Sequence, residues 1–122
     1  MSVILYEKQD SIAVITLNRP EKRNALNSEL LNGLGDYLHQ ANDDPEVKVI
    51  VIRGAGEKAF TAGFDLKESM NNNITDIVER RADTQHELDF FRYLWYLPKP
   101  VISAVQGYCI GGGNTIALMS DL

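Results

Sequence analysis

Apolar residues first occur in two short runs and then recur at helical spacing. Residues 3–8 and 12–18 are rich in β-branched and apolar side chains and are separated by the polar residues 9–11. This pattern predicts two antiparallel strands joined by a hairpin turn. From Ser28, a suitable N-cap, the apolar spacing predicts an amphipathic helix that ends at residues 42–45. Its apolar positions are Leu30, Leu31, Leu34, Tyr37, Leu38 and Ala41.

The rest of the chain continues to alternate between strand and helix. The nearly unbroken apolar run 47–52 predicts a strand that is buried on both faces, and residues 101–105 predict a second buried strand. A long helical pattern over residues 74–97 ends at 98–100, and a short apolar helix is expected over 114–119. The order ββαβαβα is typical of an α/β fold. The apolar side predicted for the long helix contains Ile77, Val78, Leu88, Phe91, Leu94 and Trp95.

Composition and charge limit the classes of function. With 122 residues, 44% hydrophobic and 24% charged, the chain fits one globular domain, residues 1–122. Its formal net charge of -5 offers no attraction to nucleic acid or to an anionic membrane, so neither partner is expected. No apolar run approaches the roughly 18 residues that cross a bilayer, and the start does not resemble a signal peptide, so we expect a cytoplasmic location. The apolar sequence 116–122 leads us to expect a continuation or a partner that replaces it.

Metal and thiol chemistry are not expected. Cys109 is the sole cysteine, so neither an internal disulfide nor a multi-cysteine zinc site can form. His39 and His86 lack a second histidine or a cysteine four residues away, so we predict no metal site and interpret both as surface histidines. Cys109 has no histidine close in sequence and is interpreted as a small buried side chain, with a nucleophilic role as the alternative.

Two segments contain more glycine than folding alone requires, and each follows a predicted buried strand. They are residues 60–66 and 107–114. Ligands of α/β sheets bind at such positions, beyond the carboxyl ends of the strands. The glycines at 111–113 permit a close backbone approach, and a helix that begins there directs unpaired amides and its positive dipole end at a ligand. Such a site suits a developing negative charge, although the glycines could instead serve a tight turn and close helix packing.

A dinucleotide site is a candidate from another class. Residues 54–59 fit the loose fingerprint G-x-G-x-x-A that follows a buried strand in NAD-binding proteins. That fingerprint requires a helix to begin inside it, and no helical period occurs before about residue 74. NAD binding is therefore disfavoured.

Four segments carry motifs in a consistent order. They are residues 17–20 with 24–26, 58–68, 98–102 and 107–114. Together they resemble the crotonase (enoyl-CoA hydratase/isomerase) superfamily, in order and at the family's spacing, across essentially the whole chain. The resemblance implies a crotonase-like spiral of ββα units whose C-terminal helical trimerisation region is missing. It also implies an acyl-CoA thioester as substrate, no cofactor apart from the coenzyme A of the substrate, and a homotrimer or hexamer of the full-length protein.

The resemblance also implies site residues. The backbone N–H groups of Phe64 and Gly112 would form an oxyanion hole, which stabilises an enolate or tetrahedral oxyanion more than a neutral carbonyl. Asp65 would brace its loop, with a direct role in proton transfer as the alternative. The residues that would surround the adenine and pantetheine are Ala25, Ala62, Asp65 and Leu66, with Arg23 or Lys67 near the phosphates.

Thr115 departs from the hydratase pattern. It stands where hydratases that resemble this chain have the first of two catalytic glutamates. A hydroxyl with no nearby base cannot take up a proton at neutral pH as a carboxylate can, so Thr115 could instead cap or pack the helix. The family's second acid comes from a segment beyond Leu122. We therefore expect a lyase or isomerase that stabilises a thioester enolate, with a C–C bond cleaving or forming enzyme or a non-catalytic acyl-CoA binder as alternatives.

Overall fold

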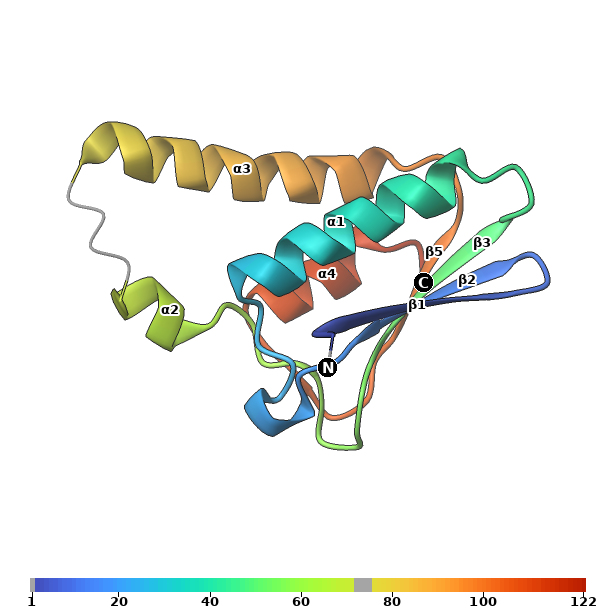
Figure 1. Ribbon diagram of the computed structural model, residues 1–122, viewed down its shortest axis with the longest axis horizontal. Coiled ribbons are helices and arrows are strands. Elements are labelled where there is room, and N and C mark those ends of the chain that lie inside the picture. The colour runs from blue at the N-terminus through green and yellow to red at the C-terminus, as the bar shows by residue number, and fades with distance from the viewer. Residues whose placement is uncertain (1, 72–75) are drawn as a thin grey trace.

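The chain folds into three successive ββα units. The computed structural model describes residues 2–71 and 76–122 (Figure 1). The second unit ends in two helices in place of one. The elements are β1 Ile4–Gln9, β2 Ile12–Leu17, the 3-10 helix η1 Pro20–Lys22, α1 Ser28–Asp43, β3 Val49–Gly54, β4 Ala59–Thr61, α2 Leu66–Asn71, α3 Ile77–Tyr96, β5 Val101–Ala104, β6 Tyr108–Cys109 and α4 Gly112–Met119.

Two sheets share these strands. The larger sheet has the order β1-β2-β3-β5, and the smaller pairs β4 with β6. The β1–β2 pair is antiparallel, with Ile4 opposite Leu17, which confirms the predicted hairpin. β2, β3 and β5 run parallel, as do β4 and β6. The second and third units thus each give one strand to each sheet, which produces the predicted α/β spiral.

The core lies between the larger sheet and α1. The predicted stripe of α1 is confirmed, because Leu30, Leu34 and Leu38 are fully buried. They belong to the same cluster as Ile15 and Ile52 of the sheet. Burying each such side chain contributes about 1.5–3 kcal/mol relative to leaving it exposed. Figure 1 shows α1 beside the larger sheet, with α3 farther from that sheet than α1.

The prediction that β3 is buried on both faces is wrong. Ile50 and Ile52 are fully buried, whereas the side chains of Val49 and Val51 are only half-buried. Successive side chains of a strand point to opposite faces, so the helices of the described part of the chain cover only one face of β3.

The long helix α3 also differs from its prediction. It begins at Ile77, and the predicted start at residue 74 lies outside the described residues. Its buried residues are Phe90 and Leu94, whereas Trp95 of the predicted apolar side is 57% exposed. Both buried residues lie in its C-terminal half, so among the described residues α3 contacts the core through only part of its length. The short elements β4, β6 and α2 were not predicted.

Candidate functional site

Phe64 lies in a short bridge between two loops that precede helices. The N–H of Leu26 donates to the C=O of Gly63 at 2.7 Å, and the N–H of Asp65 donates to the C=O of Leu26 at 3.0 Å. These bonds form a parallel bridge between Leu26 and Phe64. In such a bridge the central residue turns its own N–H away from the partner strand. The Phe64 N–H accordingly donates no hydrogen bond within the described part of the chain.

Gly112 approaches this bridge closely. It is the first residue of α4, and its N–H also has no acceptor among the residues that the structure describes. A Cβ added to Gly112 would lie 2.8 Å from Cε2 of Phe64, and one added to Gly63 would lie 2.7 Å from the C=O of Ile110 and 3.4 Å from the Gly112 nitrogen. Gly63 also has a φ of +95°, which disfavours other residues. The fold therefore brings residues 63–64 and 112 together, although they are distant in sequence.

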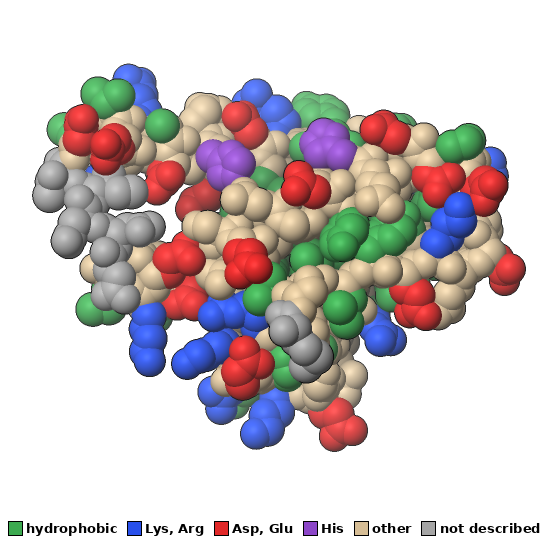
Figure 2. Space-filling view, viewed as in Figure 1, with side chains coloured by type: hydrophobic (Ala, Val, Ile, Leu, Met, Phe, Trp, Pro, Cys, Tyr) green, Lys and Arg blue, Asp and Glu red, His purple; other side chains and the backbone are tan. Residues whose placement is uncertain are grey.

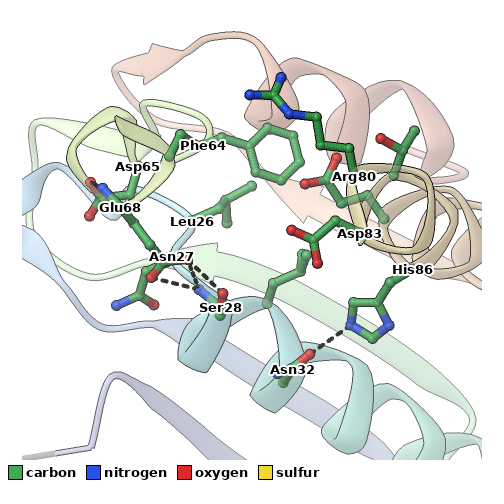
Figure 3. Close-up of a pocket in the computed structure, with 14 residues that line it drawn as sticks. Leu26, Asn27, Ser28, Asn32, Phe64, Asp65, Glu68, Arg80, Asp83 and His86 are labelled. Carbon is green, nitrogen blue, oxygen red and sulfur yellow. Dashed lines mark hydrogen bonds between the residues drawn. The ribbon is translucent and has the colours of Figure 1, made fainter. Parts of the chain in front are cut away.

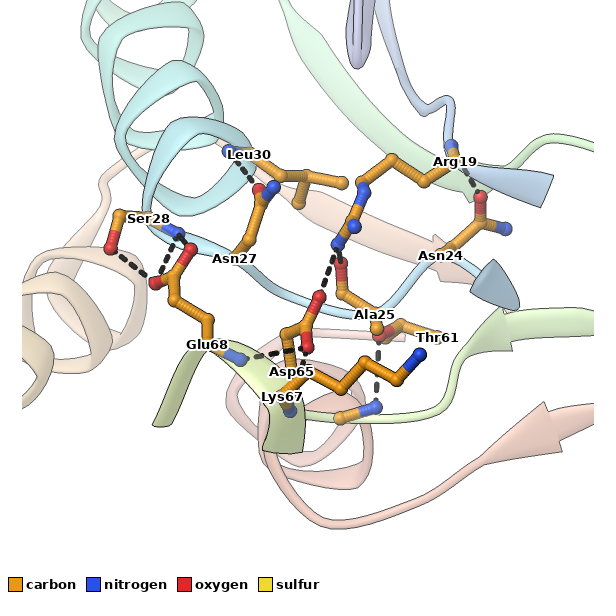
Figure 4. Close-up of polar contacts among 11 residues, drawn as sticks. Arg19, Asn24, Ala25, Asn27, Ser28, Leu30, Thr61, Asp65, Lys67 and Glu68 are labelled. Carbon is orange, nitrogen blue, oxygen red and sulfur yellow. Dashed lines mark hydrogen bonds and ion pairs between the residues drawn. The ribbon is translucent and has the colours of Figure 1, made fainter. Parts of the chain in front are cut away.

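Asp65 connects this bridge to neighbouring loops (Figure 4). Its Oδ2 lies 3.1 Å from NH1 of Arg19, and both side chains are largely buried. Its Oδ1 accepts hydrogen bonds from the N–H groups of Lys67 at 3.0 Å and Glu68 at 3.2 Å, at the start of α2. The backbone hydrogen bond from Glu68, followed by the Arg19 guanidinium, lowers the pKa of Asp65. A carboxylate held ionised in this way braces the loop and is a weak proton acceptor.

Asn24 is a buried polar residue that was not predicted as part of the site. Its Oδ1 accepts from the N–H of Arg19 at 2.9 Å, while Nδ2 donates to the C=O groups of Ala55 at 3.1 Å and Ala59 at 2.9 Å. Asn24 has a φ of +56°, a conformation that asparagine tolerates better than most residues. Its side chain thus fixes the turn that follows η1 against the start of β4.

The first turn of α1 is fixed by two side chains. Asn27 is the N-cap, because its Oδ1 accepts from the N–H of Leu30 at 2.9 Å, so the prediction of Ser28 as N-cap is off by one residue. Glu68 of α2 accepts from the backbone N–H of Ser28 at 3.0 Å and from its hydroxyl. A carboxylate at a helix N-terminus is stabilised by the unpaired amides and the helix dipole. Glu68 therefore anchors α2 to α1.

The predicted phosphate-binding cations lie on exposed surface. Arg23 has a φ of +50°, and its guanidinium lies 5.8 Å from the ring centroid of Tyr108. Lys67 is exposed in the first turn of α2, with its side chain running alongside Asp65 (Figure 4). Figure 2 shows Lys and Arg side chains gathered at the lower edge of the molecule, where Figure 1 places η1 and α2. No bond joins Arg23 to Lys67.

The other predicted substrate contacts are brought near the bridge. Ala25 and Ala62 are half-buried. The C=O of Ala25 accepts a hydrogen bond from the Arg19 side chain at 2.7 Å. The N–H of Ala62 donates to the C=O of Arg23 at 3.0 Å. Leu66 is 74% exposed. An exposed leucine beside the bridge offers apolar contact area to a ligand.

Thr115 is engaged in a bond within its own helix. Its hydroxyl donates to the C=O of Gly111 at 3.2 Å, and its backbone N–H donates to the same oxygen at 3.0 Å. This back-bonding is common for threonine in helices. The geometry fits the expectation that Thr115 packs in the first turn of α4.

The remaining candidates lie apart from this bridge or lack partners for chemistry. Burial raises the pKa of Cys109, which makes it a poor nucleophile. His39 stacks on Tyr93 with ring centroids 3.9 Å apart, and His86 shares a 2.8 Å hydrogen bond with Asn32. Within residues 2–71 and 76–122, no three His, Cys, Asp or Glu side chains group as metal ligands.

Two other absences hold for the same described residues. None of their helices has the length and apolar character needed to cross a membrane. Residues 54–59 lead from β3 into β4, so the helix that a dinucleotide fingerprint requires does not begin there.

The sequence itself matches a known family. The family model described as enoyl-CoA hydratase/isomerase matches residues 7–122. The chain belongs to this family. Among curated relatives, it is 40% identical over 119 residues to the short-chain-enoyl-CoA hydratase of Clostridium acetobutylicum and 38% identical over 118 residues to the crotonyl-CoA hydratase of Syntrophomonas wolfei.

Solved structures of the family confirm the fold. An enoyl-CoA hydratase/isomerase from Xanthobacter autotrophicus superposes with a TM-score of 0.94 at 40% identity, and covers 99% of this chain and 45% of its own. A crotonase from Legionella pneumophila gives a TM-score of 0.92 at 34% identity, over 100% of this chain and 47% of its own. The curated relatives are matched over 98% and 97% of this chain. The chain spans 44% of the length of each curated relative.

Proposed function

We propose that this chain binds an acyl-CoA thioester with the thioester oxygen between the N–H groups of Phe64 and Gly112. The observation that carries the proposal is that both N–H groups lack an acceptor among the described residues and belong to segments in close contact. As an enolate forms, negative charge develops on the thioester oxygen, and preset donors stabilise that charge more than the neutral carbonyl. The curated relatives named above as hydratases of enoyl-CoA and crotonyl-CoA support this substrate class.

The coenzyme A part would lie along the loops that flank the bridge. Arg23 and Lys67 supply positive charge for its phosphates, while Ala25, Ala62 and Leu66 offer apolar contacts for the pantetheine and adenine. Asp65 would act by holding the Phe64 loop through Arg19 and the first turn of α2. No cofactor beyond this coenzyme A is required for stabilising an enolate.

The reaction class would be that of a lyase or isomerase. The hydroxyl of Thr115 is bonded to Gly111, so proton transfer would fall to a group other than Thr115. A cytoplasmic location and a trimeric or hexameric full-length assembly stay predictions, which fractionation and analytical ultracentrifugation would test.

The direct test is whether the chain stabilises an enolate. Acetoacetyl-CoA forms an enolate whose ultraviolet absorbance reports its fraction at each pH. We expect the apparent pKa for enolate formation to fall when acetoacetyl-CoA binds the chain, since two N–H donors favour the anion. Hydrogen exchange of the Phe64 and Gly112 amides should slow in the same complex.

Two variants of one position isolate the donor. Gly112→Pro removes the N–H at a helix position that tolerates proline, whereas Gly112→Ala keeps the N–H and adds a similar steric contact with Phe64. We expect Gly112→Pro to abolish the shift in enolate pKa, with Gly112→Ala and Thr115→Ala retaining most of it. Equal shifts in Gly112→Pro and Gly112→Ala would refute the oxyanion role of the Gly112 N–H, and loss in Thr115→Ala alone would make Thr115 the principal group.

A further inference from the structure

A cavity of about 420 Å³ opens beside Phe64, between the start of α1, α2 and the first half of α3 (Figure 3). This size falls within the roughly 300–1,000 Å³ typical of small-molecule sites. Its apolar lining consists of Leu26, Leu31 and Phe64. Phe64 also carries one of the two unbonded amides, so the cavity adjoins the residue that would hold the thioester oxygen in the proposed function.

The rest of the lining is polar. In Figure 3, Asp83 points from α3 into the cavity, and His86 reaches across to Asn32 of α1. The contact between His86 Nε2 and Asn32 Oδ1 measures 2.8 Å, so these two groups satisfy one another. Asp83 forms no ion pair or hydrogen bond with another described residue. Asp83 is therefore available to accept a hydrogen bond from a ligand.

The charge of the lining is predominantly negative. Four carboxylates, those of Asp65, Glu68, Asp83 and Glu87, face one guanidinium, that of Arg80. Asp65 is paired with Arg19, whereas Glu68 only accepts hydrogen bonds from the neutral Ser28, so Asp83 and Glu87 add to a net negative charge that no printed ion pair offsets.

Two of these carboxylates, Asp83 and Glu87, also interact with each other. Burial, followed by the charge of Asp83, raises the pKa of Glu87. An acidic cavity does not suit the phosphates of coenzyme A, which leaves it for the acyl chain.

We propose that this cavity receives the distal end of the acyl chain and selects chains that end in a hydrogen-bond donor, a hydroxyl or an ammonium group, over plain alkyl chains. This inference rests on the proposed function. Asp83 is exposed, so beside a methyl end it would keep its hydrogen bonds to water and would gain nothing from the ligand. A donor end would add a direct hydrogen bond to Asp83, and an ammonium would in addition meet the negative charge.

The test compares saturated acyl-CoA probes of equal length by isothermal titration calorimetry with the 122-residue chain. The probes are hexanoyl-CoA, 6-hydroxyhexanoyl-CoA, 6-aminohexanoyl-CoA and adipoyl-CoA. We expect the amino and hydroxy probes to bind about three-fold tighter than hexanoyl-CoA, as an exposed charge-assisted contact allows, and adipoyl-CoA to bind most weakly. Asp83→Asn should remove most of the preference for the amino probe.

Asp89→Asn is the matched control. Asp89 lies on the same helix, outside this cavity, and accepts from Gln85 at 2.8 Å, so the preference should persist in that variant. Hexanoyl-CoA binding as tightly as the donor-ended probes, or Asp83→Asn and Asp89→Asn behaving alike, would overturn the inference. Butyryl-CoA separates this inference from the proposed function. If it binds and slows hydrogen exchange of the Phe64 amide while the longer probes show no preference, the proposed function stands and the inference fails. If no acyl-CoA binds, both fail.

Discussion

The negative charge of Asp65, which faces Arg19, should contribute more to the stability of the fold than the hydrogen bonds of its side chain to the start of α2. Asp65→Asn keeps a side-chain oxygen that can cap α2, because asparagine and aspartate are equally good N-caps, but it removes the charge that faces Arg19. The two side chains are only 16% and 12% exposed, so water screens the pair weakly. Hydrogen bonds to charged groups are worth about 1.5–3 kcal/mol, and Arg19 retains the Ala25 carbonyl as one acceptor. We expect Asp65→Asn to lower the free energy of unfolding by about 2 kcal/mol at pH 7.

The assay is urea unfolding followed by circular dichroism, with Asp76→Asn as the control. Asp76 caps α3 by accepting from the N–H of Val78 at 2.9 Å and has no salt bridge among the described residues. Asp76→Asn should therefore change the free energy of unfolding by less than about 0.5 kcal/mol.

The pH dependence of the Asp65→Asn effect follows from the lowered pKa of Asp65. The stabilisation is complete above the unfolded pKa of about 4, and it is lost as pH falls through the lower folded pKa. The difference between the wild type and Asp65→Asn should thus shrink as pH falls below about 4. Equal effects of the two variants at pH 7, or a difference that persists undiminished in acid, would refute the importance of the ion pair.

Two further predictions concern the neighbouring glycines and the cysteine. Gly113→Ala would place its Cβ 2.6 Å from the backbone oxygen of Thr61, so urea unfolding should show a free energy of unfolding lower by about 1–3 kcal/mol. Gly112→Ala meets the movable Phe64 ring and should lower the free energy of unfolding less. The reverse order would contradict this packing. Burial raises the pKa of Cys109, so its alkylation by iodoacetamide at pH 8 should be slower than that of free cysteine and should accelerate in urea; an unchanged rate on unfolding would contradict the burial of the thiol.

Sequence patterns predicted the elements whose apolar spacing matches their burial. The α1 stripe is an example, since Leu34 and Leu38 face the core at helical spacing. Such spacing does not reveal α2, because its apolar residues Leu66 and Met70 are 74% and 80% exposed. β4 and β6, with three and two residues, are too short for a pattern to be detected. In α3, Trp95 has the spacing expected of a buried residue but lies on exposed surface. No local sequence signal distinguishes a buried from an exposed apolar residue at such a position.

The site was predictable where backbone conformation demands a particular residue. Gly63 has a φ of +95° and its Cβ would lie 2.7 Å from the C=O of Ile110, while Gly112 lets the Phe64 ring approach its backbone. The Arg19–Asp65 ion pair was not predicted, because a loop cation is common on any surface and its partner lies far away in sequence. The role of Asn24 depends on acceptors in two later segments, which only the folded chain brings within reach.

The bridge between Leu26 and Phe64 would link the proposed ligand binding to folding. Joining these residues closes a loop of roughly 40 residues, at an entropic cost of about 3 kcal/mol that local sequence cannot repay. The orientation of the Phe64 amide therefore depends on the packing of the intervening α1 and β3, and we expect a peptide that contains the loop alone to lack an oriented donor. A ligand held by this amide would select the folded ensemble and raise its melting temperature with the logarithm of ligand concentration once that concentration exceeds the Kd. Thermal shift would then report the same event as binding, and partial unfolding at this bridge would release the ligand.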